Sequence, residues 1–315
     1  MLHSAERIVD WLAKLQILQR TAILHDGCTS LNRALPEWTK RSPGVPSPRF
    51  PLQVPHRIAG IAVGPSHAET HVLPVYDYGA IYDPLDQSVP GDHYAASHYA
   101  WAVALLAAMG RAGDTTGIDA ALDFQRRAGA RYSLSASEPH WEFNNYAWLE
   151  AFTALQLCPH RHHRQLARDI LDYLPQAPRH PRPFATNWKA MAGCFLERLG
   201  RSRNSRKLVL MGRLYLLWAL RSQRIDGCIE DIPRRSRSLQ YHYYTGALLA
   251  RHAMAVGDPY IARAAVRAAQ YGAHFIDPEG DCNYKGRGQR QIFGYASAIY
   301  LFVACHMLDS RNPSR

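Results

Sequence analysis

The stretch Ser238-Leu239-Gln240-Tyr241-His242-Tyr243-Tyr244-Thr245-Gly246-Ala247 decides how this sequence is interpreted. It places an amide, an imidazole and three phenols directly before the apolar run 247–250. A solvated loop has no need of such a cluster, and a core tolerates it only when every polar atom has a partner. We therefore expect a helix that begins with a polar, aromatic turn and continues into a packed core.

Openings of the same kind precede other apolar runs. They are His98-Tyr99 with Trp101, Asn144-Asn145-Tyr146 with Trp148, Asn187-Trp188, and Gln289-Arg290-Gln291 with Phe293 and Tyr295. Positions 98, 145, 187, 243 and 291 are separated by 47, 42, 56 and 48 residues, about the length of one helical hairpin. A repeat on this scale indicates an array of helix pairs.

The apolar spacing predicts helices almost throughout the chain after Gly91, and one before it. The expected helices cover 4–24, 92–110, 115–129, 142–157, 162–174, 187–200, 203–222, 239–256, 258–274 and 290–308. Helices with polar openings continue with Ala, Leu and Gly, whereas intervening helices such as 162–174 and 258–274 have the pattern of amphipathic surface helices. The sequence therefore predicts an all-α fold, an (α/α)5-6 toroid built as an incomplete barrel of helical hairpins. The inner helices would begin at one mouth, where their free N–H groups favour anions.

One segment departs from this pattern. Ten of the 20 prolines lie between Pro36 and Pro90, which forbids a long helix there. Because a structureless loop of this length is uncommon, we expect 36–90 to form an arm or lid across the body. No second composition regime follows, so residues 1–315 are expected to form a single domain.

The amino-acid composition indicates the charge of the binding partner. The formal net charge of +11, from 37 Lys+Arg against 26 Asp+Glu, indicates an anionic partner: nucleic acid, an acidic polysaccharide or a membrane surface. Much of the excess lies in 198–207 and 234–237. Nucleic acid is the less favoured partner because arginines and aromatics do not alternate as base stacking would require.

The sequence also limits where in the cell the protein is expected. No apolar run approaches the roughly 18–20 residues needed to span a bilayer, so no membrane span is expected. Residues 1–12 lack the apolar block of a secretory signal. The protein is expected to be cytoplasmic as written, or periplasmic or secreted if a signal has been removed. The six scattered cysteines include no CxxC pair and are expected to be buried thiols.

Several chemistries fit the sequence poorly. Glycoside hydrolysis needs two facing carboxyl groups, and the recurring residues at the helix openings are Asn, His, Tyr and Gln. The available carboxylates near the mouth are Asp92, Glu142, Asp226, Glu230, Asp231 and Asp281. His160-Arg161-His162-His163 lacks HExxH and a carboxylate at ligand spacing, so no metal or other cofactor is expected.

Elimination from a uronic acid fits better. It requires neutralisation of the carboxylate, a base for the adjacent proton and an acid for the leaving oxygen. Amides, imidazoles, guanidinium groups and phenols supply these functions without a metal. Asn145, Asn187, His242, Tyr243 and Arg287 form such a set.

At these residues the chain resembles the α/α-toroid polysaccharide lyases, the broad group with alginate-lyase-like and heparinase-like enzymes. The resemblance covers about 90–310 and lies in the openings at 144–146 and 187–188, in 241–244, and in Asn283-Tyr284-Lys285-Gly286-Arg287-Gly288-Gln289. Many members carry a β-sandwich domain after the toroid, whereas this sequence ends at 315.

The resemblance implies roles for individual residues. Tyr243 would be base or acid with His242 as its partner, and Asn145 and Arg287 would neutralise the carboxylate. The substrate-binding residues would be Asn187, Tyr241, His98, Gln291, Trp188, Tyr146 and Arg237. Which of the three tyrosines at 241, 243 and 244 acts in catalysis stays open.

Each of these residues also has a structural interpretation. Asn145 and Asn187 are good helix N-caps, and the aromatic residues can be core. The function alternatives are a glycoside hydrolase or a uronate epimerase on the same scaffold, and a helical-repeat protein that binds an anionic partner.

Overall fold

The structure is a computed structural model in which the described residues are 23–24, 71–72, 81, 94–111, 115–132, 141–175, 183–232, 237–278, 280 and 293–310. Within these ranges the protein is all-α apart from one short strand pair, which confirms the predicted all-α class. Most of the Pro-rich arm and of the predicted helix 4–24 lies outside the described residues, as do Arg287 and Gln291.

The chain divides into two compact units, Met1–Arg131 and Tyr132–Arg315. The first contains β1 (Ile23–Leu24), β2 (His71–Val72), α3 (Tyr94–Ala108) and nearly all of α4 (Thr116–Tyr132). The strands pair antiparallel, with Ile23 opposite Val72 and Leu24 opposite His71. The second unit contains α5 (Trp141–Gln156), α6 (Arg161–Tyr173), α7 (Thr186–Ser202), α8 (Arg206–Leu220), α9 (Leu239–Val256), α10 (Pro259–Ala273) and α11 (Phe293–Ser310).

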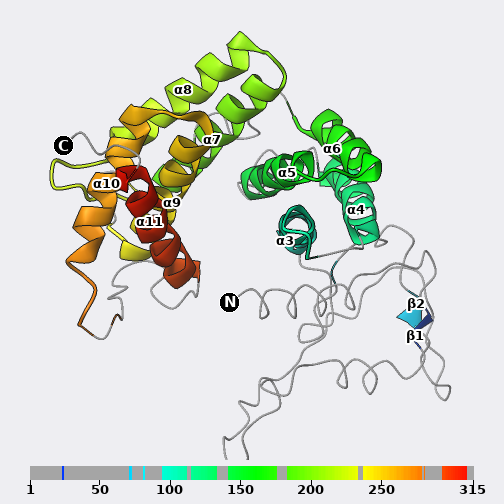
Figure 1. Ribbon diagram of the computed structural model, residues 1–315, viewed down its shortest axis with the longest axis horizontal. Helices are drawn as coiled ribbons and strands as arrows, with labels where there is room; N and C mark the ends of the chain where they lie inside the picture. Colours follow the sequence, from blue (N-terminus) through cyan, green and yellow to red (C-terminus); the bar gives the residue numbers. More distant parts are fainter. Residues whose placement is uncertain are drawn as a thin grey trace, which may run out of the picture. The chain divides into compact units, whose positions relative to one another are not determined.

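The helices of the second unit form consecutive hairpins (Figure 1). α5 packs on α6, α7 on α8, and α9 on α10, while α5, α7, α9 and α11 also contact one another in series. The contacts thus divide the second unit into inner helices, which meet inner neighbours, and the outer helices α6, α8 and α10. This is the alternation predicted from the polar openings, and the helix bounds agree with the predicted ranges within a few residues.

Local sequence explains where these helices begin and end. Ser205, Ser238 and Asp258 cap α8, α9 and α10, and each side chain accepts a hydrogen bond from a backbone N–H of the first turn. Pro259 follows Asp258 at the first helical position, where no N–H is needed. Gly257 ends α9 with φ of 72°, a left-handed conformation that glycine adopts without strain.

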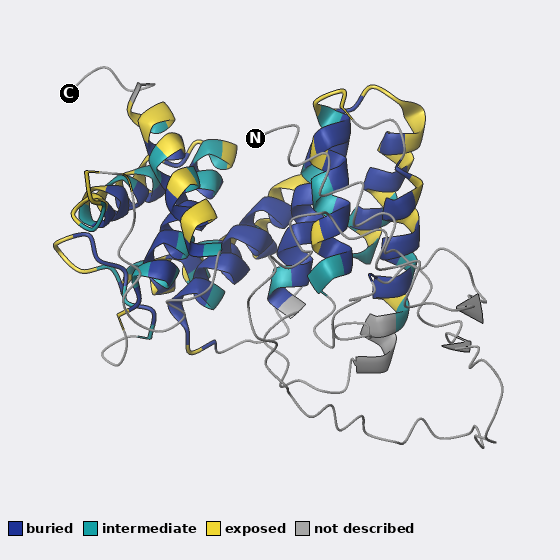
Figure 2. Cartoon of the chain, turned by 90° about the horizontal axis from the view of Figure 1, so that it is seen from below, coloured by how far each residue is buried: buried dark blue, intermediate teal, exposed yellow. Residues whose placement is uncertain are grey.

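The hairpin of α7 and α8 is unusually close. A Cβ on Gly212 would lie 2.3 Å from the backbone nitrogen of Glu197, and one on Gly193 would lie 2.7 Å from Cγ of Leu216. All residues from Ala190 to Gly200 are buried, so α7 is covered on every side. Figure 2 shows buried residues concentrated along the helices and exposed ones at turns and outer sides.

The contacts among the inner helices α7, α9 and α11 follow a fixed register. The Cys194 thiol of α7 donates to the Leu248 carbonyl of α9, 54 positions later, and Glu197 pairs with His252, 55 positions later. Arg251 of α9 contacts Tyr300 of α11, 49 positions later. These offsets are close to the sequence repeat, and they bring the N-terminal ends of α7, α9 and α11 to the same side of the unit.

In the part of the chain that the structure describes, no helix combines the length and hydrophobicity required to cross a membrane.

Candidate functional site

The first turn of α9 carries polar residues on opposite faces. Successive residues of an α-helix turn by about 100°, so 241 and 244 share one side while 242 and 243 point away from it. The hydroxyl of Tyr243 donates to the carbonyl of Gly272 at 2.8 Å, and its ring fills the space where a Gly272 side chain would stand. Tyr243 is therefore fully buried against the outer helix α10.

His242 has both ring nitrogens occupied by backbone groups. Nδ1 accepts from the Ile229 N–H at 3.0 Å, and Nε2 lies 3.0 Å from the Ala268 carbonyl. Since Nδ1 accepts, Nε2 must carry the proton that is donated to Ala268. Burial lowers the pKa of His242 to about 4, so the imidazole is neutral at pH 7. The side chains of His242 and Tyr243, which were predicted to transfer protons, are thus buried and hydrogen-bonded to backbone groups in this structure.

Tyr241 and Tyr244 occupy the opposite, inward face. The rings of both meet Phe293 at the start of α11, with centroid distances of 5.5 and 5.3 Å. Tyr244 also stacks on Phe143 of α5 at 6.1 Å. Burial raises the pKa of Tyr244, which keeps its phenol protonated. The N-terminal ends of α5, α9 and α11 therefore converge on a layer of aromatic rings.

Asn187, like Gln125 of α4, is a buried amide whose two side-chain polar atoms both lack a hydrogen-bond partner in the described structure. It lies in the first turn of α7 with 1% of its surface exposed, and neither its Nδ2 nor its Oδ1 has a hydrogen-bond partner. The register of 54 between α7 and α9 puts it level with Tyr241. Asn187 shares its helix face with Cys194 and Arg198, seven and eleven positions later, and this face meets α5 and α9. A buried amide without partners costs free energy unless a ligand satisfies it.

Asn145 lies elsewhere on its helix. It is buried, and its Nδ2 also lacks a partner. However, it shares a face of α5 with Trp148, whose ring meets Tyr173 of the outer helix α6. Phe143, Tyr146 and Glu150 form the other face. Burial and the nearby charge of Glu150 raise the pKa of Tyr146 well above 10.0.

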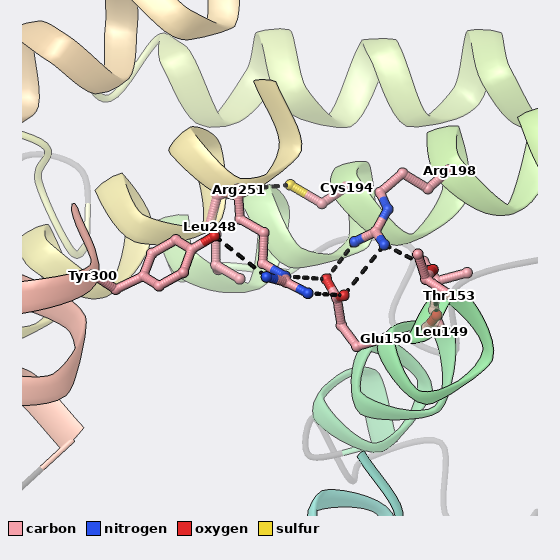
Figure 3. A network of polar contacts seen from close by, with 8 residues as sticks. All are labelled: Leu149, Glu150, Thr153, Cys194, Arg198, Leu248, Arg251 and Tyr300. Atoms are coloured by element: carbon pink, nitrogen blue, oxygen red, sulfur yellow. Dashed lines mark hydrogen bonds and ion pairs between the residues drawn. The ribbon is translucent and has the colours of Figure 1, made fainter. Parts of the chain in front are cut away.

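Deeper along the inner helices, a buried ion network joins all four of them (Figure 3). Glu150 of α5 binds Arg198 of α7 and Arg251 of α9, and Arg251 also donates to the hydroxyl of Tyr300 on α11. Arg198 further donates to Thr153 at 2.9 Å. Burial alone would raise the pKa of Glu150, but hydrogen bonds and charge from the two arginines lower it from 4.5 to about 2. One carboxylate between two guanidinium groups leaves a net charge of +1 beneath the aromatic layer.

A second buried carboxylate joins the hairpins on the other side of α7. Glu197 pairs with His252 of α9 at 3.1 Å, with Arg201 at 2.8 Å and with Arg213 of α8 at 3.3 Å. Arg213 also pairs with Asp258, the N-cap of α10. This network connects α7, α8, α9 and α10.

The basic run 198–207 is largely part of these structural contacts. Arg198 and Arg201 are held by the two carboxylates, and Arg203 donates to the Leu171 and Leu174 carbonyls at the end of α6. The run is therefore not one solvated face that could attract a polyanion. Arg206 and Lys207 are exposed, as is Arg201 despite its pairing with Glu197.

The remaining predicted residues are scattered. His98 is exposed on α3 of the first unit, with Nδ1 2.9 Å from the Tyr94 carbonyl. Trp188 is half-buried against Phe184, and Arg237 is exposed and lies 3.7 Å from Glu230. Arg287 and Gln291 lie outside the described residues, directly before Phe293. At the helix openings, the register of α7 and α9 puts Asn187 level with Tyr241, and Tyr241 and Tyr244 both contact Phe293.

One small pocket lies behind this layer. It has a volume of about 200 Å³ and is lined by Cys228, Arg237, His242 and Tyr271, among others. The Cys228 thiol, whose pKa is raised by burial, shares a hydrogen bond with Tyr271. Tyr271 belongs to α10, and His242 bonds to the Ala268 carbonyl of the same helix, so this pocket lies on the α10 side of α9 and is separate from its inward face.

Among the described residues, no group of three or more His, Cys, Asp or Glu side chains is placed to hold a metal ion. The histidine group at 160–163 lies at the start of α6, with His163 buried and its pKa lowered by burial and by the neighbouring His160 and His162.

Glu150 and Arg251 are not among the residues predicted from the sequence. Each is a charged residue in the apolar middle of an inner helix, where its charge can be compensated only by a buried partner, and this pattern could have indicated the ion pair. In comparisons with known proteins, no family model matches the chain, and no curated protein is significantly similar to it.

Proposed function

We propose that this protein is a polysaccharide lyase that cleaves a uronic-acid-containing polysaccharide by β-elimination. In this proposal the hairpin array of the second unit is part of an α/α toroid, and the substrate enters at the N-terminal ends of its inner helices. The proposal rests on Asn187 above all.

The amide of Asn187 is buried, lacks hydrogen-bond partners and stands in the first turn of a helix. Its Nδ2 offers two donors, and the N-terminal end of α7 adds a favourable field for an anion. A uronate carboxylate bound there would satisfy donors that the ligand-free protein leaves without partners. A neutral amide can also stabilise the second negative charge that develops on the carboxylate in the transition state.

Tyr241 and Tyr244 are the phenols that we assign to proton transfer. Both lie on the inward face of α9, whereas the hydroxyl of Tyr243 is engaged by Gly272. In the reaction, a base removes the proton from C5, the C4–O bond breaks, and the leaving oxygen receives a proton. Tyr244, whose phenol stays protonated, is our candidate for the proton donor, and the half-buried Tyr241, acting as its phenolate, is our candidate for the base. Arg287 and Gln291, which directly precede Phe293 in the chain, are proposed to assist in carboxylate binding.

The electrostatics support an acidic substrate. The network of Glu150, Arg198 and Arg251 carries a net positive charge below the aromatic layer. The chain as a whole has a formal charge of +11, which would steer a polyanion toward it.

Elimination leaves a conjugated double bond that absorbs ultraviolet light, which gives a direct test. Purified protein would be incubated with alginate, glucuronans, glycosaminoglycans and bacterial exopolysaccharides while absorbance and reducing ends are both followed. A joint rise in both signals on one polymer is expected. Reducing ends without absorbance would overturn the lyase in favour of a hydrolase.

A glycoside hydrolase is the second candidate, because two carboxylates are buried near the same helix ends. Glu142 lies in the first turn of α5, and the carbonyl of Asp231 accepts from the N–H of Thr186, next to Asn187. A hydrolase would lose turnover in Glu142→Gln or Asp231→Asn and keep it in Tyr244→Phe.

A further inference from the structure

The outer helix α8 exposes an apolar stripe that the proposed function does not use. Leu210, Leu214 and Leu217 have 63%, 58% and 46% of their surface exposed, and Trp218 beside them has 38%. Their spacing puts the three leucines on one face of the helix. The opposite face, with Leu208, Gly212 and Leu216, packs on α7. Figure 1 shows α8 along the outside of its unit.

Cations stand at both ends of the same stripe. Arg206 and Arg221 precede Leu210 and follow Leu217 by four residues, and Lys207 flanks the N-terminal end. All three are exposed, and in the described part of the chain none of them pairs with a carboxylate. Arg213, by contrast, turns toward Glu197 and Asp258. The face therefore combines exposed leucines with uncompensated positive charge.

We propose that this face of α8 docks on an anionic phospholipid surface. A helix with Leu and Trp on one side and Lys or Arg around them lies in the plane of a bilayer interface, with its apolar side chains below the headgroups. Tryptophan side chains are enriched at the level of the lipid headgroups, which fits the position of Trp218 beside the leucines. The ring of Trp218 also contacts a cation, since Nζ of Lys189 lies 4.6 Å from its centroid.

Other occupants fit less well. Three half-exposed leucines and one tryptophan offer far less than the roughly 800 Å² per partner that a stable protein interface buries. A second copy would bring Arg206, Lys207 and Arg221 against a face of the same charge. The exposed Ile299 and Val303 of α11 form a comparable apolar pair, but no cation flanks them in the described residues of that helix.

The test is sedimentation of the full chain with vesicles of phosphatidylcholine alone or mixed with phosphatidylglycerol. We expect binding to the mixed vesicles, at least tenfold weaker in Leu210→Ser/Leu214→Ser and about fivefold weaker for each of Arg206→Gln and Arg221→Gln. The matched control Ile299→Ser/Val303→Ser replaces two side chains that are also more than half exposed and should bind as the unaltered chain does.

Three results would overturn the proposal: no binding to either vesicle, an equal loss in the α11 control, or a dimer in solution that depends on Leu214. Circular dichroism melting of each variant separates lost binding from lost folding. The polysaccharide assay is independent of this one, so the failure of one proposal leaves the other intact.

Discussion

Glu150 of α5 and Arg251 of α9, 101 positions apart in the chain, form a two-point ion pair in the interior. Nε of Arg251 donates to one carboxylate oxygen at 2.7 Å, and Nη2 donates to the other at 2.5 Å. The bidentate geometry fixes both side chains. Arg198 of α7 binds the same carboxylate, so the pair also connects to α7. The pairing holds three inner helices in register through a single residue.

Glu150→Gln is expected to destabilise the protein strongly. The substitution keeps the shape but leaves Arg198 and Arg251 without a countercharge, and an uncompensated buried charge costs about 3–5 kcal/mol. Urea unfolding would measure this change. The control Glu230→Gln breaks pairs with the largely exposed Arg224 and Arg237 and should cost less than about 1 kcal/mol. Equal effects of the two substitutions would contradict the assigned role of Glu150.

Acid should destabilise the protein in a range set by Glu150. The pKa of this carboxyl is lowered from 4.5 to about 2 in the folded state, so the unfolded chain takes up the proton first. The stabilisation is complete above the unfolded pKa and is lost as the pH falls from about 4.5 toward 2. At about 1.4 kcal/mol per pH unit, the loss approaches about 3 kcal/mol. Unfolding measured across this range should show a clearly smaller slope in Glu150→Gln than in the unaltered chain.

The helices and their alternation could be predicted from the sequence because both depend on local patterns. The apolar spacing gave α9 its bounds, and the polar openings distinguished inner from outer helices. The facing of individual side chains could not be predicted as well. Within residues 241–244 the first and last share one side of α9 while 242 and 243 point away from it, and only the packing of α10 and α11 decides which of them is buried where.

The ion network shows a second limit of the sequence. Glu150 and Arg198 lie 48 positions apart, and nothing local indicates that they meet. Arg198 belongs to a basic run that was counted toward an anionic partner, whereas its position on the inward face of α7 makes it a core residue. The aromatic residues at the helix openings were likewise predicted from the sequence. Their pairing, such as that of Tyr244 with Phe143, could not be predicted because it depends on how α5 and α9 are aligned.

Replacing Tyr241, Tyr243 and Tyr244 by Phe one at a time should distinguish the hydroxyls that stabilise the fold from those that act in catalysis. Tyr243→Phe leaves the Gly272 carbonyl without its donor, so we expect a loss of about 1–2 kcal/mol in stability and little change in turnover. Tyr244→Phe should lower kcat by about 10²–10⁴ through loss of the proton donor while the melting temperature stays nearly the same. Tyr241→Phe should behave like Tyr244→Phe if it is the base. A loss of turnover confined to Tyr243→Phe would return the catalytic role to that residue.

Asn187→Leu is expected to make the ligand-free protein more stable and the enzyme inactive. The two residues are similar in size, and the substitution removes a buried donor and acceptor that have no partners. Their burial is costly, so the free energy of unfolding should rise by about 1 kcal/mol. Turnover should fall at least 100-fold, because the carboxylate of the substrate loses the amide that neutralises it. Asn145→Leu is the matched control, since it also removes a buried amide but on the α5 face that includes Trp148, and it should leave turnover unchanged. If Asn187→Leu destabilised the protein and kept its activity, the amide would have a structural role and the proposed carboxylate site would be wrong.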